Sequence, residues 1–389
     1  MRMIPIEAVS QNGRVQAALI HFSETVPQLV EQAIAIQQIP APTFAEARRA
    51  AYLEQQFAEV GLVDVAQDEL HNVYGRFPGS QPAEHHPLII SAHSDTVFPA
   101  ETDLTIRRED QLIYGPGIGD NSTGVAGLLA LVEALQICEI RPLADIWFVA
   151  NVGEEGLGDL RGMWAVVERF GGEAVYLIIE GGLYGQISHQ AIGVQRFEIS
   201  ISTPGGHSWG NFGQPSAIHE LGHLIAAIDK LQLPARPKTT YNAGIVEGGT
   251  SINTIAQSAR MLLDLRSEEP SRLAILLAEV EKLVSLRQQV PKVTVKMTQI
   301  GNRPAGHLPR QHPLVQQAKA ALKHVGCEKI SFIASSTDAN VPLSQGFTAV
   351  CIGLTESGHA HRLDEYMDST HLAAGMQQLL LLALSVAGI

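Results

Sequence analysis

The 389-residue sequence predicts an α/β fold in which a mixed sheet carries helices on both faces and is interrupted by a smaller inserted domain. The chain is longer than the length at which a single hydrophobic core usually stops growing, so two domains are expected. Residues 1–193 and 301–389 combine helical patterns with unbroken apolar runs, which are typical of strands covered on both faces. Residues 194–300 show alternating strands and a different order of elements.

The larger domain is predicted from its helical spacing and its apolar runs. Apolar residues indicate helices from about Arg14 to Ala35 and from Ala45 to Val60, and another from Thr123 to Leu135 follows a glycine-rich turn. Four mostly apolar runs predict buried strands: Pro87 to His93, Asp145 to Val152, Ala174 to Ile179 and Thr348 to Ile352. The final tract, "LLLLALSVAGI", is too short to span a bilayer and predicts a buried C-terminal helix.

The inserted domain, residues 194–300, has the element order β-α-β-β-α-β. Its first segment, "VQRFEISIST", alternates apolar and polar residues, as a strand with one buried face does. The later elements are a helix around Ile218 to Ile228, strands near Thr239 to Val246 and Ser258 to Arg266, a helix from Ser271 to Leu286 and a strand from Lys292 to Ile300. This is the order of the split ferredoxin-like arrangement, at the usual length of a domain.

Composition narrows the class of protein. Hydrophobic residues make up 45% and charged residues 17% of the chain, as in a globular enzyme. The net charge of -13 argues against nucleic acid or an anionic membrane as a partner. The three cysteines lack C-x-x-C spacing, and the first residues contain no apolar segment of signal-peptide length. We therefore expect a cytoplasmic protein.

Histidine and carboxylate side chains follow three of the predicted strands. His93 and Asp95 end the first, Glu154 and Glu155 follow the second, and Glu180 ends the third. In an open α/β sheet, ligands bind outside the carboxyl ends of the strands. A single carboxylate at such a position is usually a helix cap or a solvated turn residue, but three such strand ends together predict a functional site.

Two loops add candidate residues to this edge. "YGPGIGDNSTG" places Asp120 in a glycine-rich turn before a helix, and "SGHAHRLDEYMD" contains His359, His361 and Glu365. The glycines of the first loop do not match G-x-G-x-x-G, which argues against a nucleotide-binding oxidoreductase.

The residue types predict a metal site. Two histidines and several carboxylates, without clustered cysteine, suit zinc or another first-row divalent ion such as cobalt or manganese. Two ions would be balanced by Asp120, Glu155, Glu180 and a bridging hydroxide, with the histidines neutral. Glu154 is then left beside the ions, where a hydrolase needs a general base for its water.

The motifs from "SAHSDTVFP" to "HRLDEYMD" give the chain a resemblance to a known family. It resembles the dinuclear zinc metallopeptidases that include glutamate carboxypeptidase, peptidase T, aminoacylase, acetylornithine deacetylase and succinyl-diaminopimelate desuccinylase. The resemblance implies a zinc-peptidase-type catalytic domain, residues 1–193 and 301–389, with two zinc ions. It also implies that residues 194–300 are a lid and dimerisation domain, so that the protein is a homodimer.

The resemblance assigns roles at the metal site residue by residue. His93 and Glu180 would bind one ion, Glu155 and His361 the other, and Asp120 would bridge them. Asp95 would fix the tautomer of His93, a role that metal-binding histidines also need on physical grounds. Glu154 would take the proton of the bridging water and pass it to the leaving amine. His361 is preferred to His359 because "HRLDEY" fits the family pattern.

The resemblance also implies substrate-binding residues. His207 in "STPGGHSWG" would reach the partner subunit's active site and stabilise the oxyanion. Asn253 and Arg266, in "GGTSINTIAQSARMLLDLR", would contact the substrate carboxylate, and an arginine fork suits that group. Thr337 in "SSTDAN" is a further substrate-binding candidate, although serine at 336 replaces a frequent glycine. For Arg303, near the domain junction, a hinge role and a substrate role both stay open.

We therefore expect a metal-dependent hydrolase of an amide bond in a small peptide or N-acyl amino acid, of the carboxypeptidase kind. The alternatives are an N-acyl amino acid deacylase or desuccinylase and an aminopeptidase of the peptidase T kind. Because aminopeptidase relatives tend to carry Asp at position 180, Glu180 favours a substrate with a free carboxylate and an acylated amine. A binding protein without catalysis would lack a ligand or the base, and neither is missing.

Overall fold

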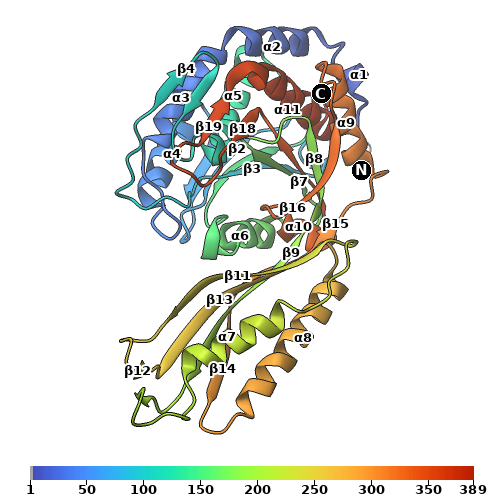
Figure 1. Ribbon diagram of the computed structural model, residues 1–389. Coiled ribbons are helices and arrows are strands. Elements are labelled where there is room, and N and C mark those ends of the chain that lie inside the picture. The colour runs from blue at the N-terminus through green and yellow to red at the C-terminus, as the bar shows by residue number, and fades with distance from the viewer. Residues whose placement is uncertain (1–2) are drawn as a thin grey trace. The chain divides into compact units, whose positions relative to one another are not determined.

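The computed structural model describes residues 3–389, which form two compact units (Figure 1). Unit 1 contains residues up to 191 together with residues 307–389, and unit 2 contains residues 192–306. The domain boundaries expected from the sequence were 193/194 and 300/301. Each unit has its own cluster of buried apolar side chains, so each has its own core.

Unit 1 is built on a nine-stranded mixed sheet. In spatial order its strands are β1 (Val63–Gln67), β2 (Val73–Phe77), β6 (Ile146–Asn151), β3 (Leu88–His93), β7 (Val175–Glu180), β17 (Thr348–Gly353), β8 (Gln186–Ala191) and β15 (Gly306–His307), while β16 (Ser331–Ser335) pairs with β8. The four neighbours β6, β3, β7 and β17 are parallel. Their carboxyl ends therefore lie at one edge of the sheet, where the predicted site residues follow them.

Helices cover both faces of this sheet, as predicted. α5 (Thr123–Ile137) and α11 (Leu372–Ala387) lie on one face, and α6 (Arg161–Phe170) and α10 (Asn340–Ser344) lie on the other (Figure 1). The remaining helices of unit 1 are α1 (Ile6–Val9), α2 (Gly13–Glu24), α3 (Val26–Gln37), α4 (Ala47–Glu59) and α9 (Pro313–His324). Strands buried on both faces explain why β3 and β7 consist of buried residues throughout.

The C-terminal helix α11 belongs to the core of unit 1. With the preceding turn, Ser369–Ala387 is long and apolar enough to cross a membrane by length and composition alone. However, 72% of this stretch is buried inside the protein. It therefore has the properties of a core helix, as the sequence predicted.

A second, smaller sheet in unit 1 lies beside the carboxyl edge. Its strands, in spatial order, are β18 (Glu356–Gly358), β19 (Tyr366–Asp368), β5 (Leu112–Tyr114) and β4 (Arg107–Glu109). The β19–β5 pairing joins two segments distant in sequence, and the main-chain N–H of Gly115 donates to the carbonyl of Glu365 at 2.9 Å. This sheet therefore holds the loop of His361 against the glycine-rich turn of Asp120.

Unit 2 contains a four-stranded antiparallel sheet with two helices on one face (Figure 1). The strands in spatial order are β11 (Thr239–Gly248), β13 (Ser258–Ser267), β9 (Gly193–Ser202) and β14 (Thr294–Arg303), and the helices are α7 (Ala217–Ile228) and α8 (Pro270–Gln288). The chain order is thus β-α-β-β-α-β, as expected for the insert. Two short strands, β10 (Gly206–His207) and β12 (Thr254–Ile255), form a separate pair.

One predicted helix is wrong in its continuity. The helix expected from Arg14 to Ala35 is two helices, α2 and α3, which meet at Thr25. Pro27 follows this junction, and a proline there cannot donate the hydrogen bond that would continue α2 and would clash with the preceding turn. The apolar periodicity runs through both helices because both pack on the same core.

We predict opposite effects on stability from alanine at two helical glycines. A Cβ at Gly375 in α11 would overlap the carbonyl oxygen of Leu354, whereas at Gly222 in α7 no atom lies within 4 Å. Gly375→Ala should lower the free energy of unfolding by about 1–3 kcal/mol through overpacking. Gly222→Ala should raise it by about 0.5–1 kcal/mol, because alanine loses less backbone entropy. Urea unfolding measures both, and stabilisation by Gly375→Ala would contradict the packing described here.

Candidate active site

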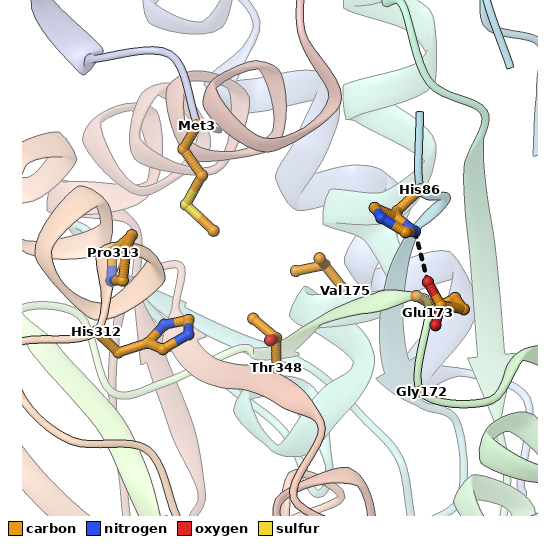
Figure 2. Close-up of a pocket in the computed structure, with 9 residues that line it drawn as sticks. Met3, His86, Gly172, Glu173, Val175, His312, Pro313 and Thr348 are labelled. Atoms are coloured by element: carbon orange, nitrogen blue, oxygen red, sulfur yellow. Dashed lines mark ion pairs between the residues drawn. The ribbon is translucent and has the colours of Figure 1, made fainter. Parts of the chain in front are cut away.

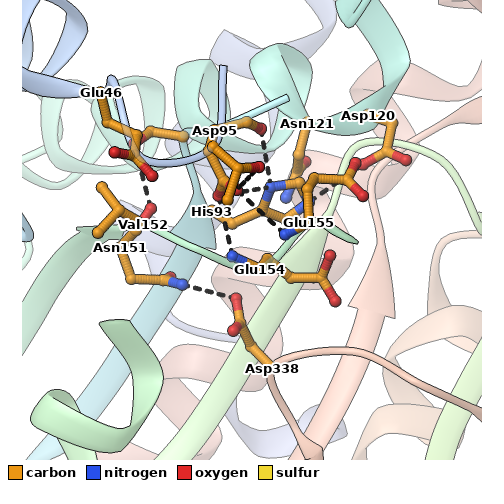
Figure 3. Close-up of polar contacts among 12 residues, drawn as sticks. Glu46, His93, Asp95, Asp120, Asn121, Asn151, Val152, Glu154, Glu155 and Asp338 are labelled. Atoms are coloured by element: carbon orange, nitrogen blue, oxygen red, sulfur yellow. Dashed lines mark hydrogen bonds and ion pairs between the residues drawn. The ribbon is translucent and has the colours of Figure 1, made fainter. Parts of the chain in front are cut away.

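The side chains that follow the parallel strands converge at the carboxyl edge of unit 1 (Figure 3). His93 Nε2 lies 3.0 Å from Asp120 Oδ1 and 3.6 Å from Glu180 Oε2. His93 comes from the end of β3, Glu180 from the end of β7, and Asp120 from the turn before α5. Three elements distant in sequence thus place one imidazole and two carboxylates within contact of one another.

His361 completes a second group around the same carboxylate. Its Nε2 atom lies 3.2 Å from Asp120 Oδ2 and 3.3 Å from Glu155 Oε1. His359, its rival in the sequence, instead places Nδ1 2.9 Å from Asp364 Oδ2 and packs edge-on against Tyr366. The geometry therefore favours His361 over His359 as the histidine of this group.

The donor atoms of these residues fit a metal site. Three groups have ligand atoms within 4.8 Å of one another: His93, Asp120 and Glu180; His93, Glu154 and Glu155; and Asp120, Glu155 and His361. Asp120 belongs to the first and third groups through its two oxygens, as a bridging carboxylate would. Imidazole and carboxylate donors without thiolate suit zinc, cobalt or manganese. The residues present thus fit two divalent ions.

The electrostatics of the cluster point the same way. Burial raises the pKa of Glu155 and of Glu180. Burial also acts to raise the pKa of Asp120, but hydrogen bonds with His361 and His93 hold it well below its ordinary range. Hydrogen bonds with Asp120 and Glu155 raise the pKa of His361 to about 10. Carboxylates this close need positive charge beside them, which divalent cations would supply.

Asp95 organises the turn that carries the two adjacent glutamates (Figure 3). It is fully buried, and its carboxylate accepts hydrogen bonds from the main-chain N–H groups of Glu154 and Glu155, both at 3.0 Å. The hydroxyl of Thr43 donates to the same carboxylate at 2.9 Å. These three donors fix the position of the turn relative to the end of β3.

The contact between Asp95 and His93 is made mainly by the main chain. His93 Nδ1 lies 3.1 Å from the main-chain oxygen of Asp95 and 3.6 Å from its carboxylate. Because a carbonyl can only accept, the proton of neutral His93 lies on Nδ1. Nε2 then presents its lone pair toward Asp120 and Glu180, as a metal ligand requires.

Arg49 of α4 supports this turn from behind. Its guanidinium is almost completely buried and donates to the main-chain oxygens of Ser94, at 2.7 Å, and of Ile39. Burial lowers the pKa of Arg49 to about 10, while the charge of Asp95 opposes this shift. No motif in the sequence assigned Arg49 a role. A basic residue at a buried helical position was the signal that could have identified it.

Asn121, which follows Asp120, grips the end of β7. Its Nδ2 donates to the main-chain oxygen of Ile179 at 2.8 Å, and its Oδ1 accepts from the N–H of Gly181 at 2.7 Å. These two main-chain groups flank Glu180. The side chain of Asn121 therefore fixes Glu180 relative to Asp120. The feature of the sequence that could have identified Asn121 is its position directly after Asp120, a candidate metal ligand.

Glu365 holds the turn of Asp120 from the other side. One oxygen, Oε1, accepts from the main-chain N–H groups of Gly119 and Asp120, both at 2.9 Å. Burial and the charge of Asp120 raise the pKa of Glu365 to about 7. The family pattern in "HRLDEY" singled out this glutamate without giving it a role, and the structure places it in support of Asp120.

A buried pair lies next to Glu154. Asn151 at the end of β6 donates to Asp338 Oδ2 at 2.7 Å, and both side chains are fully buried (Figure 3). Burial raises the pKa of Asp338 to about 7. The neighbouring Thr337, a predicted substrate-binding residue, is also buried, and its hydroxyl accepts from the N–H of Ala339 at 3.3 Å.

In unit 2, two of the three remaining candidates lie together. His207 and Asn253 are exposed on the segments paired through β10 and β12, where the N–H of Ser208 donates to the main-chain oxygen of Asn253 at 3.0 Å. His207 Nδ1 accepts from the N–H groups of Trp209 and Gly210. The proton of neutral His207 therefore lies on Nε2, which is the state that can donate to an oxyanion.

Arg266 lies at the other end of unit 2. It is near the end of β13, whereas the β12 segment adjoins Ser258 at its start, so about 25 Å separate them at roughly 3.3 Å per residue. Arg266 also forms a two-bonded ion pair with Asp264, with distances of 2.7 and 3.2 Å. Within one chain, Asn253 and Arg266 therefore do not converge on one carboxylate.

A separate cavity of about 330 Å³ opens at the opposite edge of the unit 1 sheet (Figure 2). It is lined by the starts of β7 and β17 and by His312, and His86 lies 3.2 Å from Glu173 at its rim. The predicted site residues do not line it. It lies at the amino ends of the strands, away from the convergent carboxylates.

Comparison with known proteins supports the same architecture. The family model described as "Peptidase family M20/M25/M40" matches residues 89–385 of the chain. The uncharacterized protein YqjE of Bacillus subtilis is 23% identical over 83% of this chain and 89% of its own length. A probable carboxypeptidase of Trichophyton verrucosum is 27% identical, but the match spans only 48% of this chain and 44% of that protein. The solved structure of a tripeptidase of Staphylococcus aureus is 22% identical and superposes with a TM-score of 0.80, in a match that covers 93% of this chain and 98% of the tripeptidase chain. This likeness confirms the predicted fold class.

We predict that the two histidines of the loop differ in metal binding. His361→Ala should lower the zinc content of the purified protein, because it removes a donor beside Asp120 and Glu155. His359→Ala is the matched control and should keep the wild-type content. Elemental analysis after dialysis measures both variants. Full zinc content in His361→Ala, with loss in His359→Ala, would reverse the assignment.

Proposed function

The chain belongs to peptidase family M20/M25/M40, and on this basis we propose that it hydrolyses an amide bond in a small peptide or N-acyl amino acid with a free carboxylate. The observation that carries the proposal is the place of Glu154. This buried carboxylate lies beside a histidine and carboxylate cluster that fits two divalent ions. A base next to such a cluster is what amide hydrolysis requires.

We assign the ligands as the distances suggest. His93 and Glu180 would hold one zinc ion, Glu155 and His361 the other, and Asp120 both. When bound, the ions would polarise the scissile carbonyl and make a bound water more acidic. Cobalt or manganese would suit the same donors.

Glu154 would move the proton during hydrolysis. Its carboxylate takes a proton from the attacking water and later delivers it to the leaving nitrogen. Its main-chain N–H is held by Asp95, so its backbone stays fixed relative to His93 while the proton moves. A fixed backbone sets the distance between the Glu154 carboxylate and the attacking water before the reaction begins, which favours proton transfer.

The remaining assignments concern unit 2 and assembly. We propose that unit 2, which contains the predicted insert 194–300, is a lid and dimerisation domain. We also propose that His207 of one protomer donates a hydrogen bond to the oxyanion at its partner's site. Arg266, Asn253 and Thr337 would bind the substrate.

The cysteines of the described chain are free thiols, which supports a reducing, cytoplasmic location.

Two related activities use the same residues. An N-acyl amino acid deacylase or desuccinylase would differ only in the acyl group accepted. An aminopeptidase of the peptidase T kind would need an acidic group for a free α-ammonium. The arginines of unit 2 favour a carboxylate, and the relative named a probable carboxypeptidase supports the same choice.

We predict that Glu154→Gln lowers kcat by about 10²-fold or more, because proton transfer by a positioned base is typically worth about 10²–10⁴. Glutamine keeps the shape of the side chain but cannot take a proton. Folding and zinc content should stay at wild-type levels, measured by circular dichroism and elemental analysis. The exposed Glu168→Gln in α6 is the control and should have wild-type turnover. Wild-type turnover in Glu154→Gln would remove the base assignment.

The substrate class is tested by three matched compounds. We expect an N-acylated amino acid with a free carboxylate to be hydrolysed with a higher kcat/KM than its C-terminal amide, because the carboxylate positions the scissile bond. The third compound is a dipeptide amide with a free amine. Better hydrolysis of this compound than of the first would make the protein an aminopeptidase.

A further inference from the structure

A guanidinium group lies directly against the glycine that precedes Glu154. A Cβ on Gly153 would lie 2.3 Å from Arg161 Nη1 and 2.9 Å from Arg161 Cζ, which is closer than a Cβ can approach. The φ angle of Gly153 is 70°, a left-handed conformation that glycine adopts at no steric cost. The turn that carries the two glutamates therefore begins at a glycine whose Cα is covered by the Arg161 side chain.

The Arg161 side chain is itself held in place. Its Nη2 forms an ion pair with Glu46, whose side chain is only 1% exposed. The same oxygen of Glu46, Oε1, accepts from the main-chain N–H of Phe44 at 2.9 Å. Arg161 Cζ also lies 4.5 Å from the centre of the Phe44 ring, as in a cation–π contact. The guanidinium thus contacts a buried carboxylate, an aromatic ring and Gly153.

One nitrogen of this guanidinium has no hydrogen-bond partner among residues 3–389. Arg161 Nη1 is buried, and Gly153 is its neighbour. Buried N–H groups without a partner are rare because they cost free energy. What this nitrogen contributes is therefore its packing on the main chain of the turn.

The main chain ties Arg161 to the same glycine. Arg161 is the first residue of α6, and the N–H of Leu160 just before it donates to the carbonyl of Gly153 at 2.9 Å. Gly158 lies between them in sequence, and a Cβ there would lie 2.7 Å from the Cα of Gly153. The start of α6 and Gly153 are thus packed without space between them.

One short segment before α4 anchors both groups that contact the turn. Thr43 donates to the carboxylate of Asp95, which accepts the two glutamate N–H groups of the turn. Glu46, three residues after Thr43, holds Arg161. Asp95 therefore fixes the N–H groups of the turn, while Arg161 fixes Gly153, and both depend on residues 43–46.

We propose that Arg161 is a positioning residue for amide hydrolysis, which fixes the main chain at Gly153 and thereby the place of the base Glu154. This inference rests on the proposed function and deepens it. Displacement of a reacting group by about 1 Å can lower turnover about 10²-fold, so loss of the contact should appear in kcat. KM should change little, because Arg161 contacts the backbone of the turn and is not among the residues proposed to bind the substrate.

The first test is Arg161→Lys, which keeps a positive charge for Glu46 but removes the planar group that covers Gly153. We expect kcat to fall about tenfold or more while KM changes less than about twofold. The matched control is Arg169→Lys in the same helix, whose guanidinium lies over the rings of Tyr74 and Trp147 and should leave kcat unchanged. Circular dichroism and zinc analysis confirm that each variant is folded and loaded.

A second variant acts on the same contact without touching a buried charge. Phe44 is 64% exposed, so Phe44→Ala removes the ring from the guanidinium without opening the core. It should lower kcat in the same direction but less than Arg161→Lys. The two effects should not add in the double variant, because both act through one contact.

Amide hydrogen exchange tests the positioning without any substrate. The N–H groups of Glu154 and Glu155 should lose protection in Arg161→Lys, whereas those of β3 should keep the wild-type rates. Wild-type kcat in both variants, equal losses in the Arg169→Lys control, or exchange that rises evenly throughout unit 1 would each overturn the inference. If the wild-type protein hydrolyses no amide, the proposed function fails. Unchanged exchange in Arg161→Lys would then refute the inference as well, and a local loss of protection would uphold the hold of Arg161 on the turn.

Discussion

Mutual repulsion among three carboxylates at one sheet edge is the constraint on which the candidate site depends. Asp120, Glu155 and Glu180 come from three separate elements and are brought to two histidines in a mostly buried position. Burying such charges costs far more than exposing them, so they persist together only if the surrounding fold holds them and cations balance them. The parallel order of β6, β3 and β7 meets the first requirement, because it ends three strands at the same edge.

The supporting contacts fix these groups largely through the main chain. Asp95 binds the N–H groups of the glutamate turn, Asn121 binds both sides of Glu180, and Glu365 binds the N–H groups at Asp120. A contact of this kind sets the position of a ligand without occupying its carboxylate or imidazole lone pairs. Those atoms therefore remain available to a cation, and the orientation of each donor is set before any ion arrives.

The sequence could predict which side chains gather at the candidate site but not the residues that hold them in place. A buried apolar run that ends in His93 or Glu180 is visible in the sequence, and parallel strands bring such ends together. Arg49 and Thr43 act on residues about fifty positions away, and their partners are main-chain atoms or a carboxylate that no local pattern specifies. The break between α2 and α3 was not predicted either, because the apolar periodicity continues through Pro27 and indicates one long helix.

The register of unit 2 refines where a substrate carboxylate would gain most. Val194 in β9 pairs with Arg266 on one side and Arg303 on the other. Arg196 lies 3.1 Å from Asp264, the carboxylate that also binds Arg266. Arg196 and Arg266 thus share one aspartate at this end of the sheet, and the strand register places Arg303 in the same row of residues as Arg266. Asn253, at the far end, is uncharged. Since a hydrogen bond from a guanidinium to a carboxylate is stronger than a neutral one, we infer that a substrate carboxylate would gain more at the arginine end of this sheet than at Asn253.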